Sequence, residues 1–228
     1  MNFRVFDDRD ALVRGTADAI LDTIESEQAR VIALSGGSTP RPVYEMLGSE
    51  PLRRRLAAVP LIWVTGDERD VPPDHPESNA GMIRSTLFRH GIPEGQVFLT
   101  FDTRRDGRDS VVEEFEAEWR KLGIEGLDLA IQGIGEDGHT ASLFPGTTIL
   151  EAIDRIAASV WVPKVSMWRF SLTAPVIGSA KKKLFLAAGK GKREILTRIR
   201  AGEEFPSTVV TRFGGPAWWL VDRDAYPE

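Results

Sequence analysis

Short apolar runs alternate along the chain with segments in which apolar residues recur every three or four positions. The clearest helical segment follows Asp7 and Asp8, either of which can cap a helix. Its apolar positions share one face of a 3.6-residue period: Val13, Ala17, Ile20, Leu21 and Ile24. Further helices are predicted to start at Pro40, at Ser78 or Asn79, at Asp109 or Ser110, and at Lys192. The apolar runs predict strands over residues 3–6, 30–34, 61–64, 97–101, 127–131, 169–173, 183–188 and 218–221.

This alternation predicts an α/β fold with a mostly parallel central sheet and helices on both faces, Rossmann-like and doubly wound in a modified form. No internal repeat or low-complexity linker divides the chain, and the polar stretch 102–109 is too short to separate two domains. We therefore predict a single domain over residues 1–228. The run Lys181-Lys182-Lys183 is predicted to be a solvated turn.

Composition removes several classes of function. The 228 residues include 29 Lys and Arg against 34 Asp and Glu, a net charge of −5, and contain no cysteine and three histidines. An acidic chain is poorly suited to nucleic acid, because phosphate contacts need clustered basic residues. The lack of cysteine excludes disulfides, thiolate metal sites and cysteine nucleophiles. No segment approaches the roughly 20 apolar residues of a membrane span, so we expect a cytoplasmic protein that binds neither nucleic acid nor membrane.

In open α/β sheets, ligands bind beyond the carboxyl ends of the strands. The first strand end with unusual chemistry leads into Gly36, Gly37, Ser38 and Thr39, followed by a helix. Unpaired backbone N–H groups at a helix start attract anions, and glycines let a phosphate approach. The loop is not a Walker motif, since no Gly-Lys-Ser/Thr follows. The alternative is a simple strand-to-helix turn with a Ser/Thr cap.

The second strand end carries Asp67, Glu68, Arg69 and Asp70. Arg69 can clamp a phosphate or carboxylate with paired N–H groups. The alternative is a solvated loop with a local ion pair. Two more cations stand near strand ends: Arg169 opens a predicted strand, and Lys192 follows a glycine-rich turn.

The third strand end runs from Gly133 to Ser142 and contains Gly135, Asp137 and His139. Its G-x-G-x-x-G pattern is typical of a dinucleotide-binding site, but residues 145–146 (Pro-Gly) interrupt the long helix that such a site needs. His139, two residues from Asp137, is the natural general base at neutral pH. The alternative is a histidine that only bonds the backbone of a tight turn. Ser142 invites a serine-hydrolase interpretation, which the lack of G-x-S-x-G disfavours.

Five ordered blocks together resemble the 6-phosphogluconolactonase family, within the glucosamine-6-phosphate isomerase/6-phosphogluconolactonase superfamily. The blocks span nearly the whole chain: residues 34–40; Asp67-Glu68-Arg69 with Ser78-Asn79; residues 133–146; Arg169-x-Ser171-x-Thr173; and Gly189-x-x-Lys192.

The superfamily also contains the glucosamine-6-phosphate deaminases, which are the main alternative. Their pattern places Asn-Glu shortly after the histidine, where this chain has Leu143 and Phe144, and has Tyr at the position of Arg69. A non-enzymatic sugar-phosphate-sensing domain is a further alternative, but no residues are spare for a helix-turn-helix.

The resemblance implies hydrolysis of 6-phospho-D-glucono-1,5-lactone to 6-phospho-D-gluconate in the oxidative pentose phosphate pathway, with no metal or cofactor. It implies a catalytic set of His139, Asp137 and Arg69. It implies substrate contacts from Gly36, Gly37, Ser38, Thr39, Asp67, Arg69, Asn79, Gly135, Arg169 and Lys192. We expect a monomer or weak homodimer.

Overall fold

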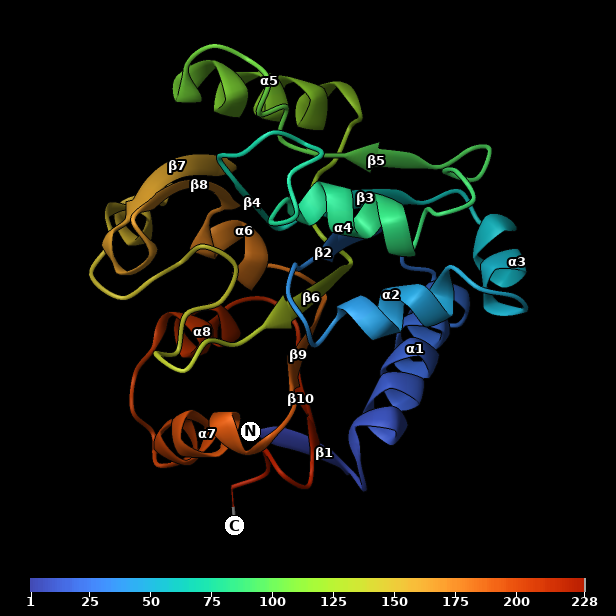
Figure 1. Ribbon diagram of the computed structural model, residues 1–228, viewed down its shortest axis with the longest axis vertical. Helices are drawn as coiled ribbons and strands as arrows, with labels where there is room; N and C mark the ends of the chain where they lie inside the picture. Colours follow the sequence, from blue (N-terminus) through green and yellow to red (C-terminus); the bar gives the residue numbers. More distant parts are fainter. Residues whose placement is uncertain (228) are drawn as a thin grey trace.

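The computed structural model describes residues 1–227. Seven of its strands form a central sheet (Figure 1). Every pair of neighbouring strands in this sheet is parallel. The strands stand in the order β1 (Asn2–Phe6), β10 (Ala217–Asp222), β9 (Lys182–Ala187), β6 (Leu129–Gly133), β2 (Val31–Leu34), β3 (Ile62–Thr65) and β5 (Val97–Leu99). The predicted mostly parallel α/β sheet is confirmed.

Helices cover both faces of the sheet because successive side chains of each buried strand point to opposite sides. On β9, Leu184 and Leu186 join one hydrophobic cluster, whereas Phe185 and Ala187 join the other. The first cluster lies under α1 (Arg9–Glu25), α2 (Arg41–Leu47), α3 (Leu52–Ala57) and α4 (Asn79–Thr86) (Figure 1). The second lies under α5 (Arg108–Lys121), α6 (Ala174–Gly178), α7 (Arg193–Arg200) and α8 (Pro206–Val209). Single 3₁₀ turns occupy Thr148–Glu151, Pro163–Val165, Lys190–Lys192 and Val210–Arg212.

A second, antiparallel sheet of three strands lies beside the central one within the described residues. It contains β4 (Asp67–Arg69), β8 (Met167–Leu172) and β7 (Ala157–Val162), in that order. The strand predicted over residues 169–173 therefore belongs to this small sheet. Phe170 and Leu172 of β8 are fully buried in the same cluster as α5. The hydrophobic pattern gave no sign of β4, because its three residues are all charged.

Two of the predicted side-chain caps are confirmed, and one predicted helix start is not. Asp8 caps α1 by accepting from the Ala11 N–H (2.7 Å), and Ser78 caps α4 by accepting from the Gly81 N–H (3.0 Å). Helix α5 begins at Arg108, so the predicted start at Asp109 or Ser110 is slightly late. No helix within residues 1–227 is long and apolar enough to cross a membrane.

The predicted solvated turn at residues 181–183 holds for the exposed Lys181 but is wrong for the two lysines that follow. Lys182 and Lys183 lie in β9, and Lys183 is 0% exposed. Its ammonium group donates to the carbonyl oxygens of Gly178 (2.6 Å) and Phe213 (2.7 Å), which compensates its burial. The lysine thereby ties the end of α6 to the segment before β10.

Candidate active site

Four neighbouring strands, β9, β6, β2 and β3, end along one edge of the central sheet. The loops that follow them line a cavity of about 210 Å³. After β2 the chain adds strands on one side (β3, β5), and after β6 it adds strands on the other side (β9, β10), so the strand order reverses between β2 and β6. In open α/β sheets, the crevice at such a reversal binds ligands. Every predicted site residue except Asp137 lines the cavity: Gly36, Gly37, Ser38, Thr39, Asp67, Arg69, Asn79, Gly135, His139, Arg169 and Lys192.

The glycine-rich loop between β2 and α2 forms one wall of the cavity. Within the described chain, no backbone N–H of residues 36–39 donates to a backbone carbonyl. These groups are available to an anion, as the sequence predicts. Gly36 also lets α4 approach the loop, because a Cβ at this position would lie 1.7 Å from the Asn79 Oδ1.

Two arginines are paired on neighbouring strands of the small sheet. Arg69 of β4 lies directly opposite Arg169 of β8 in the antiparallel register. Like charges in such positions destabilise a sheet by themselves, so the pair favours an anion nearby. The Nε atoms of both are buried without a hydrogen-bond partner in residues 1–227. The Arg69 Nη1 donates to the Glu77 carbonyl (2.6 Å), which fixes its direction at the rim of the cavity.

Asp67 is a buried carboxylate that lines the cavity and is only 4% exposed. Its oxygens accept from the Asn79 amide (3.1 Å) and the Ser142 hydroxyl (2.7 Å), and Arg169 lies 3.8 Å away. Ser142 is 0% exposed and already donates to this carboxylate. This burial and this hydrogen bond disfavour Ser142 as a nucleophile, in line with the lack of G-x-S-x-G around it.

Glu68, between two predicted site residues, has a structural task. One of its carboxylate oxygens accepts from the backbone N–H of Asn79 (2.6 Å), and the other from that of Ala80 (2.7 Å), at the start of α4. Burial raises the pKa of Glu68, although these hydrogen bonds act in the opposite direction. The residue joins β4 to α4 and so sets the positions of Asp67 and Asn79.

His139 and Asp137 form a close pair beside the cavity. The His139 Nδ1 lies 2.5 Å from the Asp137 Oδ1, and the ring of His139 stacks on Phe144 at 3.8 Å between centroids. Burial lowers the pKa of His139, and the neighbouring carboxylate, which raises it, does not cancel this effect. The lowered pKa favours the neutral imidazole at physiological pH. With Nδ1 held by Asp137, Nε2 is the nitrogen free to accept a proton.

The backbone of the His139 loop depends on two glycines. A Cβ at Gly135 would lie 2.0 Å from the His139 Nδ1, so glycine makes room for the imidazole. Gly138 has a φ of +78°, which disfavours other residues, and a Cβ there would lie 2.4 Å from the ring of Phe205. Phe205 at the start of α8 therefore packs directly against the loop.

Lys192 reaches the cavity from the turn between β9 and α7. The buried carboxylate of Asp222, at the end of β10, accepts from the Gly189 N–H (3.0 Å) and holds this turn. Sequence reasoning missed Asp222, although its position directly after the predicted strand 218–221 was a usable signal. It also missed Lys164, whose Nζ lies 2.7 Å from the Asp137 Oδ2. Lys164 comes from the hairpin of the small sheet, which no pattern predicted.

The α/β fold places His139 beside a set of cationic groups in one cavity, an arrangement suited to an enzyme that acts on a small anionic ligand. The chain matches the family described as "Glucosamine-6-phosphate isomerases/6-phosphogluconolactonase" over residues 7–219. It belongs to this family, as the five sequence blocks predicted.

Relatives named 6-phosphogluconolactonase match this chain over most of its length. The 6-phosphogluconolactonase of Nostoc sp. is 35% identical, covering 98% of this chain and 96% of the relative. That of Rattus norvegicus is 33% identical, covering 94% and 87%. The crystal structure of 6-phosphogluconolactonase from Thermotoga maritima has a TM-score of 0.83 at 28% identity, covering 97% of this chain and 99% of that one.

Proposed function

We propose that this chain hydrolyses 6-phospho-D-glucono-1,5-lactone to 6-phospho-D-gluconate, in the oxidative pentose phosphate pathway. Relatives named 6-phosphogluconolactonase over nearly the full length support the reaction. The observation that carries the mechanism is the His139–Asp137 pair beside a cavity lined with Arg69, Arg169 and Lys192.

The substrate phosphate binds the backbone of residues 36–39 and Lys192. Arg69 and Arg169 supply positive charge at the phosphate and at the reacting carbonyl. Asp67 and Asn79 line the same cavity, and their oxygens are suited to accept hydrogen bonds from sugar hydroxyls.

His139 acts as the general base. Its Nε2 accepts a proton from water while the water oxygen bonds to C1 of the lactone, and Asp137 holds the imidazole through Nδ1. The bond from C1 to the ring oxygen then breaks, and the same proton goes to that oxygen. An arginine stabilises the oxyanion of the tetrahedral intermediate. A placed base supplies about 10²–10⁴-fold acceleration, which suffices for a reactive lactone.

The deaminase alternative lacks its acid group. The position where that pattern has glutamate is Phe144, whose ring stacks on His139 and lies 5.4 Å from the Arg169 guanidinium. A phenyl ring cannot move a proton, whereas lactone hydrolysis needs none there. We also propose that the enzyme is cytoplasmic, is a monomer or weak homodimer, and needs no metal or organic cofactor. Chelators should leave its rate unchanged, and inhibition by them would contradict this.

The deciding assay supplies freshly generated 6-phosphogluconolactone and, separately, glucosamine 6-phosphate, and follows acid and ammonia release. Acid from the lactone alone supports the proposal, and ammonia release overturns it. His139→Gln should lower kcat by about 10²–10⁴-fold with little change in KM. The exposed His90→Gln is the matched control. Full activity of His139→Gln would remove this residue as the base.

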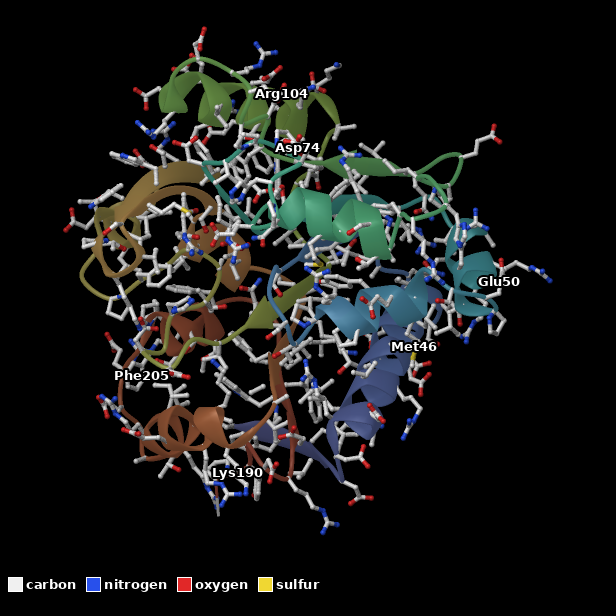
Figure 2. The ribbon with its side chains drawn as sticks, in the orientation of Figure 1. Met46, Glu50, Asp74, Arg104, Lys190 and Phe205 are labelled. Carbon is white, nitrogen blue, oxygen red and sulfur yellow. The ribbon has the colours of Figure 1, made fainter. Side chains whose placement is uncertain are left out.

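Two neighbouring lysines test the phosphate contact. Lys192 lines the cavity, whereas Lys190 (labelled in Figure 2) lies on the same turn, is exposed and does not line it. Lys192→Met should raise KM by about tenfold or more, the loss of a charge-assisted hydrogen bond. Lys190→Met should leave KM unchanged, and equal effects of the two substitutions would contradict the assignment.

A further inference from the structure

Lys164 extends the His139–Asp137 pair into a row of three residues. It lies on the 3₁₀ turn Pro163–Val165, which joins β7 to β8. Its Nζ is 2.7 Å from the Asp137 Oδ2, while the Oδ1 of the same carboxylate is 2.5 Å from the His139 Nδ1. Each oxygen of Asp137 thus has a different charged or polar partner, and the carboxylate is fixed between the small sheet and the His139 loop.

We propose that Lys164 is a positioning residue for the reaction: it holds Asp137 against the His139 Nδ1 and offsets the charge of this carboxylate, so that the imidazole stays neutral and basic at Nε2. The proposal rests on the proposed role of His139 as the base. Lys164 does not line the cavity, so it acts through Asp137 and not on the substrate.

The charges around His139 decide the direction of the effect. Asp137 on its own loop and Asp67 of β4 favour the protonated ring, whereas Arg169 of β8 disfavours it. Phe144 covers one face of the ring without charge. The ammonium group of Lys164 forms an ion pair with the Asp137 carboxylate. It thereby reduces the degree to which this carboxylate stabilises the protonated imidazole. Removal of this positive charge leaves Asp137 uncompensated, which raises the pKa of His139 and protonates the base at higher pH.

The same contact has a geometric role. The hairpin that carries Lys164 continues into β8, which carries Arg169. The ion pair therefore ties the strand of a substrate-binding arginine to the loop of the base. Asp137 also keeps Nδ1 as the protonated nitrogen, which leaves Nε2 to accept the proton from water.

The experiment compares Lys164→Met and Lys164→Arg with the unsubstituted protein. The imidazole of His139 is titrated by NMR, its signals assigned with His139→Gln, and kcat/KM for the lactone is followed against pH. We expect Lys164→Met to raise the midpoint of His139 by about 0.5–1 pH unit, as is typical of the loss of one partly exposed charge. The acid limb of kcat/KM should move upward equally, and Lys164→Arg should restore both.

Lys181→Met is the matched control. Lys181 makes a comparable exposed ion pair with Asp128 (2.8 Å) at the opposite edge of the sheet. It should change neither the titration nor the pH profile, whatever it does to stability.

The outcomes separate this proposal from the proposed function. An unmoved midpoint of His139 in Lys164→Met overturns the role of Lys164, as does a raised KM with an unchanged pH profile, which would make Lys164 a substrate contact. A midpoint that moves while His139→Gln keeps full activity refutes His139 as the base, and with it the catalytic part of this inference. Lack of lactonase activity in the unsubstituted protein refutes the proposed function, while the NMR titration still tests the charge coupling.

Discussion

The ion pairs of Asp137 should make the stability of the protein depend on pH in a specific window. Burial by itself would raise the pKa of this carboxyl, but hydrogen bonds from Lys164 and His139 lower it from 3.8 to about 2. Because the folded value lies below the unfolded one, the ionised carboxylate stabilises the fold above pH 4. This contribution is lost as the pH falls through 3.8 towards 2.

The magnitude follows from the size of the shift. At roughly 1.4 kcal/mol per unit, a shift of this size corresponds to about 2.5 kcal/mol, of which about half is lost by pH 3. The Asp137 side chain is 24% exposed and its partner Lys164 is 58% exposed. Solvent screening therefore reduces the expected contribution to about 1–2 kcal/mol at neutral pH.

Urea unfolding followed by tryptophan fluorescence tests the expectation. Asp137→Asn should be less stable than the unsubstituted protein at pH 6, and the difference should shrink by about 0.5–1 kcal/mol between pH 6 and pH 3. Asp74→Asn, in an exposed loop (Figure 2), serves as the control and should show no such convergence. Parallel stability curves for Asp137→Asn and the unsubstituted protein would refute the reasoning.

Three further substitutions probe other parts of the structure. Gly36→Ala should raise KM at least tenfold, because its Cβ would lie 1.7 Å from the Asn79 Oδ1 and displace the glycine-rich loop; unchanged kinetics would contradict this. Lys183→Met should lower the free energy of unfolding by about 2–4 kcal/mol, since two buried carbonyls lose their donor. A change under about 0.5 kcal/mol in urea titrations would contradict this, because it would mean that the cost of burying the ammonium group equals the gain from its hydrogen bonds. Asp222→Ala should raise KM more than it lowers kcat, because it releases the turn that carries Lys192; the reverse pattern in steady-state kinetics would be evidence against that link.

The predicted part of the site came from local signals. The glycines of residues 36–37 and the neighbouring hydroxyls directly follow a buried strand in the sequence. Their position at the carboxyl edge of the sheet was therefore predictable from the order of the elements alone. His139 was singled out in the same way, and the structure places it in the cavity. Such positions are predictable because strand ends and glycine turns are decided by a few adjacent residues.

The partners of these residues were not predictable by the same means. The bond between Ser142 and Asp67 joins positions 75 residues apart, and that between Lys164 and Asp137 joins positions 27 apart. The three charged residues of β4 form a strand only because β8 supplies the hydrogen-bonding edge. Lys183 looked like part of a solvated run, yet its buried ammonium donates to the carbonyl of Phe213, 30 positions away, as well as to the nearby Gly178 carbonyl.

By itself, the sequence determined the α/β class, the parallel sheet, most helix starts and the family, because periodicity, capping and short motifs depend on neighbouring residues. Only the tertiary structure decided which charges face one another: Arg69 opposite Arg169, and Lys164 behind Asp137 and His139. Electrostatic effects depend on distance and burial in three dimensions. The protonation state of the proposed base is therefore a property of the assembled fold and not of the motif that contains it.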